Sequence, residues 1–219
     1  ANVLTREVAK NSEKAGKWLS NILILKLPLT ILALVAVFIL INVLGYDSLT
    51  KNLVYISSIC MVLDSFTTTF FAVVRGFHNL KYESISSVIF QLIVLIFGYG
   101  ALLAGGGLIA AMLALALAST FNFVYSLIIL KRKVKVPLKF VYDKALIKEI
   151  IKIAWPFAVY AIFQRLYTYL DSVLLSVLAG DVQVGLYQIA FKIIFALQFL
   201  PMAFTASLYP AMSSYWQNN

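Results

Sequence analysis

The sequence predicts an all-α integral membrane protein with six transmembrane helices. Of its 219 residues, 62% are hydrophobic and only 12% are charged, whereas an average soluble protein is about 45–50% apolar and about 25% charged. The mean hydropathy is +0.93, and apolar runs long enough to cross about 30 Å of hydrocarbon recur along the chain. These values exclude disordered, collagen-like and nucleic-acid-binding proteins and argue against a water-soluble domain.

Six apolar runs predict the membrane-spanning helices. They are too long and unbroken for barrel strands, which need about 10 residues of strict alternation. A helix also satisfies its own backbone hydrogen bonds, as a span in lipid must. The three glycines at 105–107 predict a tight hairpin rather than a phosphate-binding loop, because no Gly-Lys-Ser/Thr follows them. The runs lie at residues 19–45, 53–74, 84–104, 107–130, 153–179 and 184–210.

The basic residues predict the orientation. Fourteen lysines and arginines precede the first run or lie in the loops after the second and fourth runs, and Lys51 alone lies in the opposite loops. Cytoplasmic loops hold the excess of basic residues. We therefore expect a multi-pass protein of the cell membrane, with residue 1 and the chain end on the cytoplasmic side.

The long basic loop after the fourth run divides the chain. Between Lys144 and Lys152, apolar residues at helical spacing alternate with charged ones, which is typical of an interfacial amphipathic helix that leads into a span. The sequence thus predicts three parts: residues 1–135 with four helices, a cytoplasmic linker at 136–152, and residues 153–219 with two helices.

The chain offers little for metal or redox chemistry. It has one cysteine, Cys60, and one histidine, His78, which exclude a disulfide framework and leave almost nothing for a zinc site. We expect no catalytic residues, no metal and no cofactor.

Five ionisable residues lie inside the apolar runs, where each is a candidate functional residue. Lys26 lies near the inner end of its run, where its long stem can reach the interface, and this favours a structural role. Asp64 is followed by three threonines and needs a partner or a proton; a coupling role and a structural role are both open. The other three are Arg165, Asp171 and Lys192.

The fifth run carries a polar stripe. At 100° per residue, Tyr160, Gln164, Thr168 and Asp171 fall within about 80° of one another, and Arg165 extends the stripe on one side. Such a stripe faces protein or water. Contacts between helices are one explanation, and a water-filled cavity is the one we favour, because two opposite charges and a glutamine exceed what packing needs.

Depth along the helices links the last two runs. At 1.5 Å per residue, Asp171 and Lys192 lie about 13 and about 12 Å inward from the outer turn. We therefore expect these two residues to pair or to share one site. Gln188 precedes Lys192 by one helical turn on the same face.

Several stretches resemble those of a known family. They are residues 3–10, the loop 75–85, and the segments 155–157, 169–173 and 180–192. In order and spacing they resemble the polysaccharide biosynthesis flippases, which belong to the multidrug/oligosaccharidyl-lipid/polysaccharide exporter superfamily. The resemblance covers essentially the whole chain.

The resemblance implies a larger transporter. Members of the family have twelve or fourteen helices in two lobes around a central cavity, and they move lipid-diphosphate-linked oligosaccharides from the cytoplasmic to the outer leaflet. By position, residues 1–135 would be helices three to six of the first lobe, and residues 153–219 the first two helices of the second. The chain is then expected to be a fragment whose last two helices line the cavity.

This resemblance suggests a substrate site. Arg165 and Lys192 would bind the diphosphate, and Asp171 would hold one of them when the substrate is absent. Gln164, Thr168 and Gln188 would line the same cavity. The expected partners are membrane lipids, a polyprenyl-diphosphate-linked oligosaccharide and other polysaccharide-assembly membrane proteins, with no nucleic acid.

Two other functions compete with this one. A drug/cation antiporter of the same superfamily would use an acidic, aromatic cavity with coupling carboxylates such as Asp64 or Asp171. A membrane-bound lipid-sugar transferase would need clustered carboxylates or a histidine dyad. The lone His78 lies in a loop beside Arg75 and Lys81, with no carboxylate pair, which argues against the transferase.

Overall fold

The computed structural model describes residues 2–134, 136 and 141–198 of the chain. Every regular element in this part is helical, as predicted. The elements are α1 (Asn2–Lys10), the 3-10 turn η1 (Ser12–Lys14), α2 (Ala15–Val43), α3 (Ser48–Gly76), α4 (Lys81–Ile93), the π-helical η2 (Val94–Gly98), α5 (Tyr99–Leu103), α6 (Gly107–Ile129), the π-helical η3 (Leu130–Val134), α7 (Lys144–Ala179) and α8 (Asp181–Leu197).

Four helical stretches are long and apolar enough to cross a membrane. They match the first four predicted spans and run over Ser12–Val43, Ser48–Gly76, Lys81–Leu103 and Gly107–Val134. The fifth predicted span lies in α7, a helix of 36 residues that is not in this class. Its polar stripe explains the difference, because glutamine, arginine and aspartate interrupt the apolar run. The sixth predicted span begins in α8, where Val182–Leu197 is apolar but shorter than a span, and its predicted continuation over 199–210 falls outside the described residues.

The turns between these helices follow from their residues. Asp47 caps α3 by accepting the backbone N–H of Thr50 at 3.1 Å, and Gly45 just before it has φ 70°. Gly105 and Gly107 have φ 74° and 65°, a region that glycine enters without strain. The three glycines thus form the predicted tight hairpin between α5 and α6.

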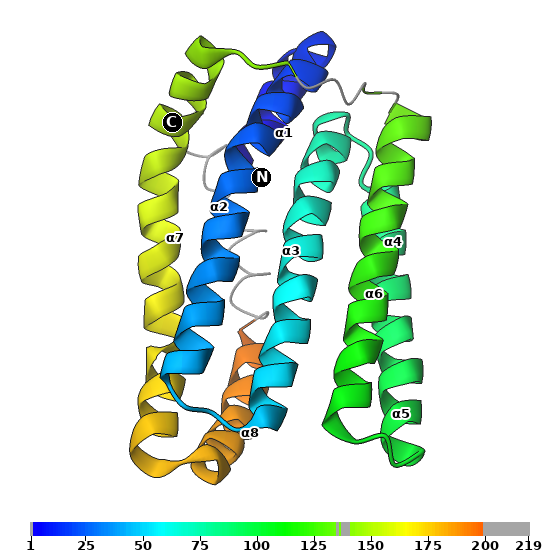
Figure 1. Ribbon diagram of the computed structural model, residues 1–219. Helices are drawn as coiled ribbons and strands as arrows, with labels where there is room; N and C mark the ends of the chain where they lie inside the picture. Colours follow the sequence, from blue (N-terminus) through cyan, green and yellow to red (C-terminus); the bar gives the residue numbers. More distant parts are fainter. Residues whose placement is uncertain (1, 135, 137–140, 199–219) are drawn as a thin grey trace, which may run out of the picture. The chain divides into compact units, whose positions relative to one another are not determined.

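The small residues of α6 allow close helix packing. Ala114 and Ala118 are buried at 6% and 0% exposure, and α6 packs against α3 and α4. A side chain on Gly98 of η2 would touch Ala114 at 4.0 Å. Small residues let helix backbones approach each other, so this side of α6 packs closely against its neighbours. Figure 1 shows α3 and α6 as neighbouring rods.

One end of the helix bundle holds the main apolar cluster, here called the end cluster. It joins α1, α2, α3, η3 and the first turns of α7 through Leu4, Val8, Trp18, Leu19, Phe70, Val73, Leu130, Leu146 and Ile150. Figure 1 shows α1 beside the start of α2 at this end. Thr5 anchors α1 further, because its hydroxyl donates to the carbonyl of Ala72 at 2.9 Å.

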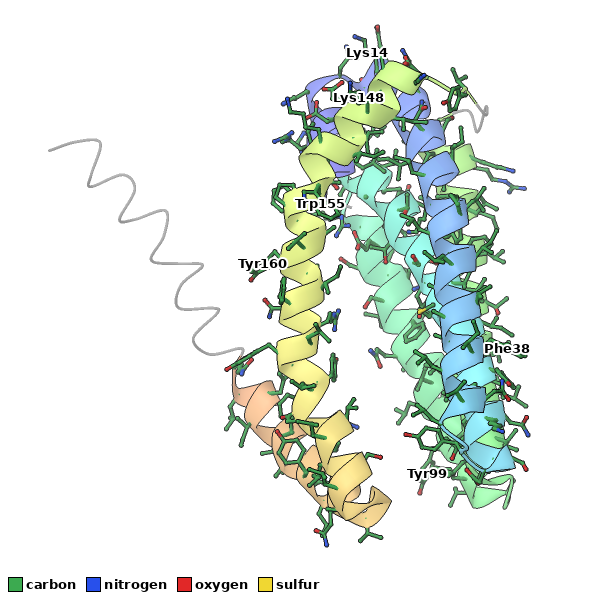
Figure 2. The ribbon with its side chains drawn as sticks, turned by 60° about the vertical axis from the view of Figure 1, so that its left-hand side comes forward. Lys14, Phe38, Tyr99, Lys148, Trp155 and Tyr160 are labelled. Atoms are coloured by element: carbon green, nitrogen blue, oxygen red, sulfur yellow. The ribbon has the colours of Figure 1, made fainter. Side chains whose placement is uncertain are left out.

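The segment predicted as an amphipathic helix forms the beginning of α7. Leu146 and Ile150 are buried in the end cluster, whereas Lys144, Lys148 and Lys152 are exposed. Figure 2 shows Lys148 and Lys14 projecting at the same end of the molecule. The chain divides into two compact units, Ala1–Ala154 and Trp155–Asn219, with the boundary inside α7.

Candidate functional site

The polar residues of the second unit lie on α7 and α8. Side-chain hydrogen bonds join these helices: Tyr187 donates its hydroxyl proton to Asp171, and Nε2 of Gln188 donates to Oγ of Ser172 at 2.7 Å. The second carboxylate oxygen of Asp171 accepts the backbone N–H of Ser172 at 2.7 Å. Each oxygen of this carboxylate therefore has a donor from the protein.

The predicted pairing of Asp171 with Lys192 is not observed. Tyr187 occupies the carboxylate in place of the lysine. Lys192 is exposed and takes part in none of the ion pairs between described residues. The two residues lie on neighbouring helices without direct contact between their charges.

The tight turn between α7 and α8 explains this difference. The predicted connection ran over four residues, but α8 begins directly after Gly180, whose φ is 84°. Gln188 then lies opposite Ser172. Four residues further along α8, Lys192 lies level with Thr168, one turn away from the carboxylate it was expected to meet.

Arg165 is the second cation of this unit. Its Nη1 donates to the hydroxyl of Tyr169 at 3.3 Å, and its guanidinium carbon lies 5.8 Å from the centroid of that ring. Arg165 is exposed, and it too is absent from the ion pairs of the described residues. The charges of both cations are thus available to an anionic ligand.

The remaining stripe residues form an accessible polar face on α7. Gln164 is exposed, and its carbonyl accepts the hydroxyl proton of Thr168 at 2.8 Å. Tyr160 is 68% exposed and projects away from α7 in Figure 2. The stripe exists as a feature of α7, and the water-filled cavity around it stays a prediction.

Asp64 lies in the first unit, in the middle of α3. Its Oδ2 accepts the hydroxyl proton of Ser119 on α6 at 3.2 Å, and its Oδ1 is buried without a hydrogen-bond partner among the described residues. Two of the threonines that follow donate to carbonyls of their own helix: Thr67 to Leu63 at 2.9 Å and Thr68 to Asp64 at 2.8 Å. Asp64 therefore has unused capacity to accept a proton or a ligand.

Lys26 links α2 to α3. Its ammonium donates to the carbonyl of Ser65 and to the hydroxyl of Thr69 at 2.7 Å, and it lies 5.3 Å from the centroid of the Phe66 ring. The ammonium group of Lys26 is therefore bound between α2 and α3, which agrees with a structural role. The side chain was expected to extend to the membrane interface, and it contacts α3 instead.

Comparison with known proteins identifies the family. The family model described as "Polysaccharide biosynthesis protein" matches residues 1–216. The chain belongs to the polysaccharide biosynthesis protein family. No curated protein matches the chain, and no solved structure matches it. Membership in the family confirms the resemblance that the order of several short stretches predicted.

Within this member of the polysaccharide biosynthesis protein family, Tyr187 is a residue that sequence reasoning missed. The sequence signal that could have indicated it was Gly180. Glycine adopts positive φ without strain, so it can end one helix and let the next helix begin directly after it. That register brings Gln188 to Ser172 and Tyr187 to Asp171. The missed tyrosine is therefore the partner of a residue that the sequence did single out.

Proposed function

We propose that this protein is a flippase that moves a lipid-linked oligosaccharide from the cytoplasmic to the outer leaflet of the cell membrane for polysaccharide biosynthesis. It would do so without covalent catalysis. Membership in the polysaccharide biosynthesis protein family supports the proposal, as do four helices able to span a membrane. The observation that carries it is the pair of exposed cations, Arg165 and Lys192, on two helices joined by hydrogen bonds.

The chemistry of these cations suits a diphosphate headgroup. A diphosphate that crosses a region of low dielectric constant needs charged donors, and hydrogen bonds between ionised groups are about twice as strong as neutral ones. Arg165 presents a planar fork that can bind phosphate oxygens in pairs, and Lys192 presents a mobile point charge. Both charges lie within helical stretches rich in apolar residues.

The position of Tyr187 changes the part that Asp171 plays in this proposal. The carboxylate was expected to hold a cation while the substrate was absent. Because Tyr187 and Ser172 donate to it, the lysine needs no release from an ion pair before it binds phosphate. Asp171 instead positions α8 against α7 in this scheme.

The proposed direction of transport rests on the basic loops. With the basic end in the cytoplasm, as the positive-inside rule predicts, the carrier would receive a polyprenyl-diphosphate-linked oligosaccharide from the cytoplasmic leaflet. Membrane lipids would surround it, and other membrane proteins of polysaccharide assembly would supply or accept the substrate.

Neutralising the two cations tests the proposal. Arg165→Gln and Lys192→Gln, each in the full-length protein, are expressed in cells that lack their own copy, and surface polysaccharide is measured. A hydrogen bond to a charged group contributes about 1.5–3 kcal/mol, and about 1.4 kcal/mol corresponds to tenfold. We expect export to fall between about tenfold and about 100-fold, with unchanged protein in the membrane fraction.

A loop cation provides the matched control. Arg132→Gln removes the same charge from η3, where the side chain is exposed, and should leave export unchanged. Arg165→Lys keeps the charge but not the fork, so export should be intermediate. Undiminished export in both Arg165→Gln and Lys192→Gln contradicts the proposal, and loss of drug resistance with intact polysaccharide export would favour the antiporter instead.

A further inference from the structure

Three exposed lysines form one face at the start of α7. Lys144, Lys148 and Lys152 recur at every fourth residue, and all three are exposed. At about 100° per residue they fall within about 80° of one another. Leu146 and Ile150 are buried in the end cluster, and each lies about 160° from Lys148 around the helix. The start of α7 therefore turns its apolar side to the protein and its lysines to the outside.

These lysines differ from other basic residues at the same end of the bundle. The two basic residues of α1 contact Glu7, and Lys17 contacts Asp143. The three lysines of α7 take part in none of the ion pairs between residues that the structure describes. The one acidic residue between positions 144 and 152 is Glu149, which is exposed and equally absent from these ion pairs. The face therefore keeps a positive charge that is open to an anionic partner.

The protein holds this face in place without help from the membrane. Asn21 accepts the backbone N–H of Asp143 at 2.9 Å, and the carboxylate of Asp143 accepts the N–H groups of Ala145 and Leu146 at 2.9 and 3.1 Å. Because Leu146 and Ile150 pack into the end cluster, they are not available for insertion into lipid, as an interfacial amphipathic helix would require. The lysines are therefore what this segment offers to a partner, and they are already positioned for binding.

Two exposed apolar residues mark where the hydrocarbon begins along α7. Ile151 is 49% and Trp155 is 67% exposed, both within about 60° of Lys148 around the helix, and Figure 2 shows Trp155 further along α7 than Lys148. Tryptophan is enriched at membrane interfaces. Lys152 lies at this level, whereas Lys148 and Lys144 lie about 6 and about 12 Å further out along the helix axis. Since a headgroup layer is about 5–8 Å thick, it takes in Lys152 and Lys148, and Lys144 lies beyond it.

We propose that Lys148 and Lys152 bind the phosphate of an anionic phospholipid in the leaflet at the basic end of the bundle. Side chains four residues apart on a helix have Cβ atoms about 5–6 Å apart, so both ammonium groups reach one phosphodiester. A zwitterionic lipid fits less well, because its own cation competes with the lysines for the phosphate. The site is distinct from the proposed diphosphate site, since Arg165 lies about 20 Å further along the same helix, and it does not depend on which substrate is carried.

Thermal unfolding of the purified full-length protein in a neutral detergent tests this site. The midpoint is measured while short-chain phosphatidylglycerol is added, because a ligand that binds only the folded state raises the midpoint. Phosphatidylcholine of the same chain length is the neutral lipid, and inorganic phosphate is the free anion. We expect a saturable rise with phosphatidylglycerol, a smaller rise with phosphatidylcholine and none with phosphate. The response to phosphatidylglycerol should decrease as sodium chloride is added, because salt screens exposed charges.

Substitution of the two lysines locates the effect. A lysine near an anionic surface contributes about fivefold to affinity, so Lys148→Gln combined with Lys152→Gln should weaken the apparent affinity for phosphatidylglycerol by up to about 25-fold. Lys148→Arg combined with Lys152→Arg keeps both charges and should keep the response. Lys144→Gln should have a smaller effect than either single glutamine variant, because this residue lies beyond the headgroup layer.

A second pair of lysines provides the matched control. Lys131→Gln combined with Lys133→Gln removes the same charge from η3, where both side chains are exposed. These two residues are two positions apart and therefore do not share one face of a helix. The control variant should respond to phosphatidylglycerol as the wild type does.

Several results would overturn the proposal. Equal rises with the two phospholipids contradict it, and so does a control variant that loses the response as fully as the Lys148 and Lys152 double variant. A rise with polyglutamate as large as that with phosphatidylglycerol assigns the face to an acidic protein partner instead. If the double variant does not fold, the two single variants and the salt dependence of the wild type decide.

Discussion

The side chain of Asn21 on α2 holds the backbone N–H of Asp143 at 2.9 Å, directly before α7. Its amide nitrogen donates to the carbonyl of Val141 at 2.9 Å and to that of Lys17 at 2.8 Å, and the residue is 0% exposed. One buried amide thus satisfies a donor and an acceptor of a distant loop. The start of α7 is fastened to the start of α2 through this contact.

Asn21→Ala should destabilise the protein. The variant leaves the N–H of Asp143 and the carbonyl of Val141 without their partner, and a buried polar group left unsatisfied costs about 1–3 kcal/mol. We expect a loss of about 2–4 kcal/mol in unfolding free energy, allowing for relief by water. Thermal unfolding of the full-length protein in detergent measures the effect.

Asn42→Ala serves as the comparison. It removes the same side chain from the same helix, but Asn42 is exposed and bonds to the carbonyl of Phe38 and the hydroxyl of Tyr55. Its effect should stay below about 1 kcal/mol, as for most surface substitutions. Equal losses of unfolding free energy in the two variants would show that burial of the Asn21 amide does not increase its contribution to stability.

The same loop predicts a dependence on pH. The ammonium of Lys17, 2.6 Å from Oδ2 of Asp143, and the backbone N–H of Leu146 lower the pKa of the Asp143 carboxyl below its ordinary value. A carboxyl whose pKa is lowered by folding adds stability above the unfolded pKa of about 3.9. This contribution is lost as the pH falls through the folded value.

Asp143→Asn isolates that charge, because asparagine also caps helices well. The variant should lower the unfolding midpoint at about pH 6 and have less effect at about pH 3, where the wild-type carboxyl is protonated. Glu149→Gln, at an exposed position of the same helix, is the reference. A constant difference between variant and wild type across this range contradicts the assignment.

Gly76→Ala should displace α1. A Cβ on Gly76 would lie 2.6 Å from Cβ and Cγ1 of Val8 and 3.1 Å from the carbonyl oxygen of Thr5. Overpacking of this kind costs about 1–3 kcal/mol. The expected result is a lower unfolding midpoint and faster proteolysis near the N-terminal helix.

Two further variants make this prediction specific. Gly100→Ala places the same methyl group where nothing lies within 4 Å, and it should be neutral or stabilising, since alanine favours helix over glycine. Val8→Gly combined with Gly76→Ala removes both clashing atoms of residue 8, so the double variant should lose less stability than the sum of the two single variants. Additive losses would mean that the contact with α1 is not the cause.

The orientation can be checked with the single cysteine. Cys60→Ser removes the only thiol, and Lys51→Cys near the start of α3 or Lys148→Cys near the start of α7 then introduces one on opposite predicted sides of the membrane. A membrane-impermeant maleimide should label Lys51→Cys in intact cells and Lys148→Cys only after lysis, because basic loops stay in the cytoplasm. Labelling of Lys148→Cys in intact cells reverses the predicted topology.

The sequence predicts the first four spans well, because their apolar runs are longer than those of the helices and strands of soluble proteins. It does not reveal the π-helical turns at Val94–Gly98 and Leu130–Val134, since hydropathy is the same for both helix types. The amphipathic pattern at 144–152 predicts a helix, but not that its apolar face packs into the end cluster around Leu4. Such contacts depend on which elements meet in space.

The polar residues of α7 could be found by their cost in an apolar run, and Asp64 by the same argument. Their partners could not be found in this way. The position of a residue along its helix gives its depth, but it does not show which residue of the neighbouring helix it contacts. Asp171 therefore received the wrong partner, whereas its own importance was recognised.

At the turn at Gly180, the number of residues between α7 and α8 is as important for the contacts of these helices as the types of residue in the turn. A single inserted residue would rotate α8 by about 100° relative to α7. Tyr187 and Gln188 would then leave Asp171 and Ser172 at the same time. A change in length by one residue should therefore be more harmful here than any single substitution.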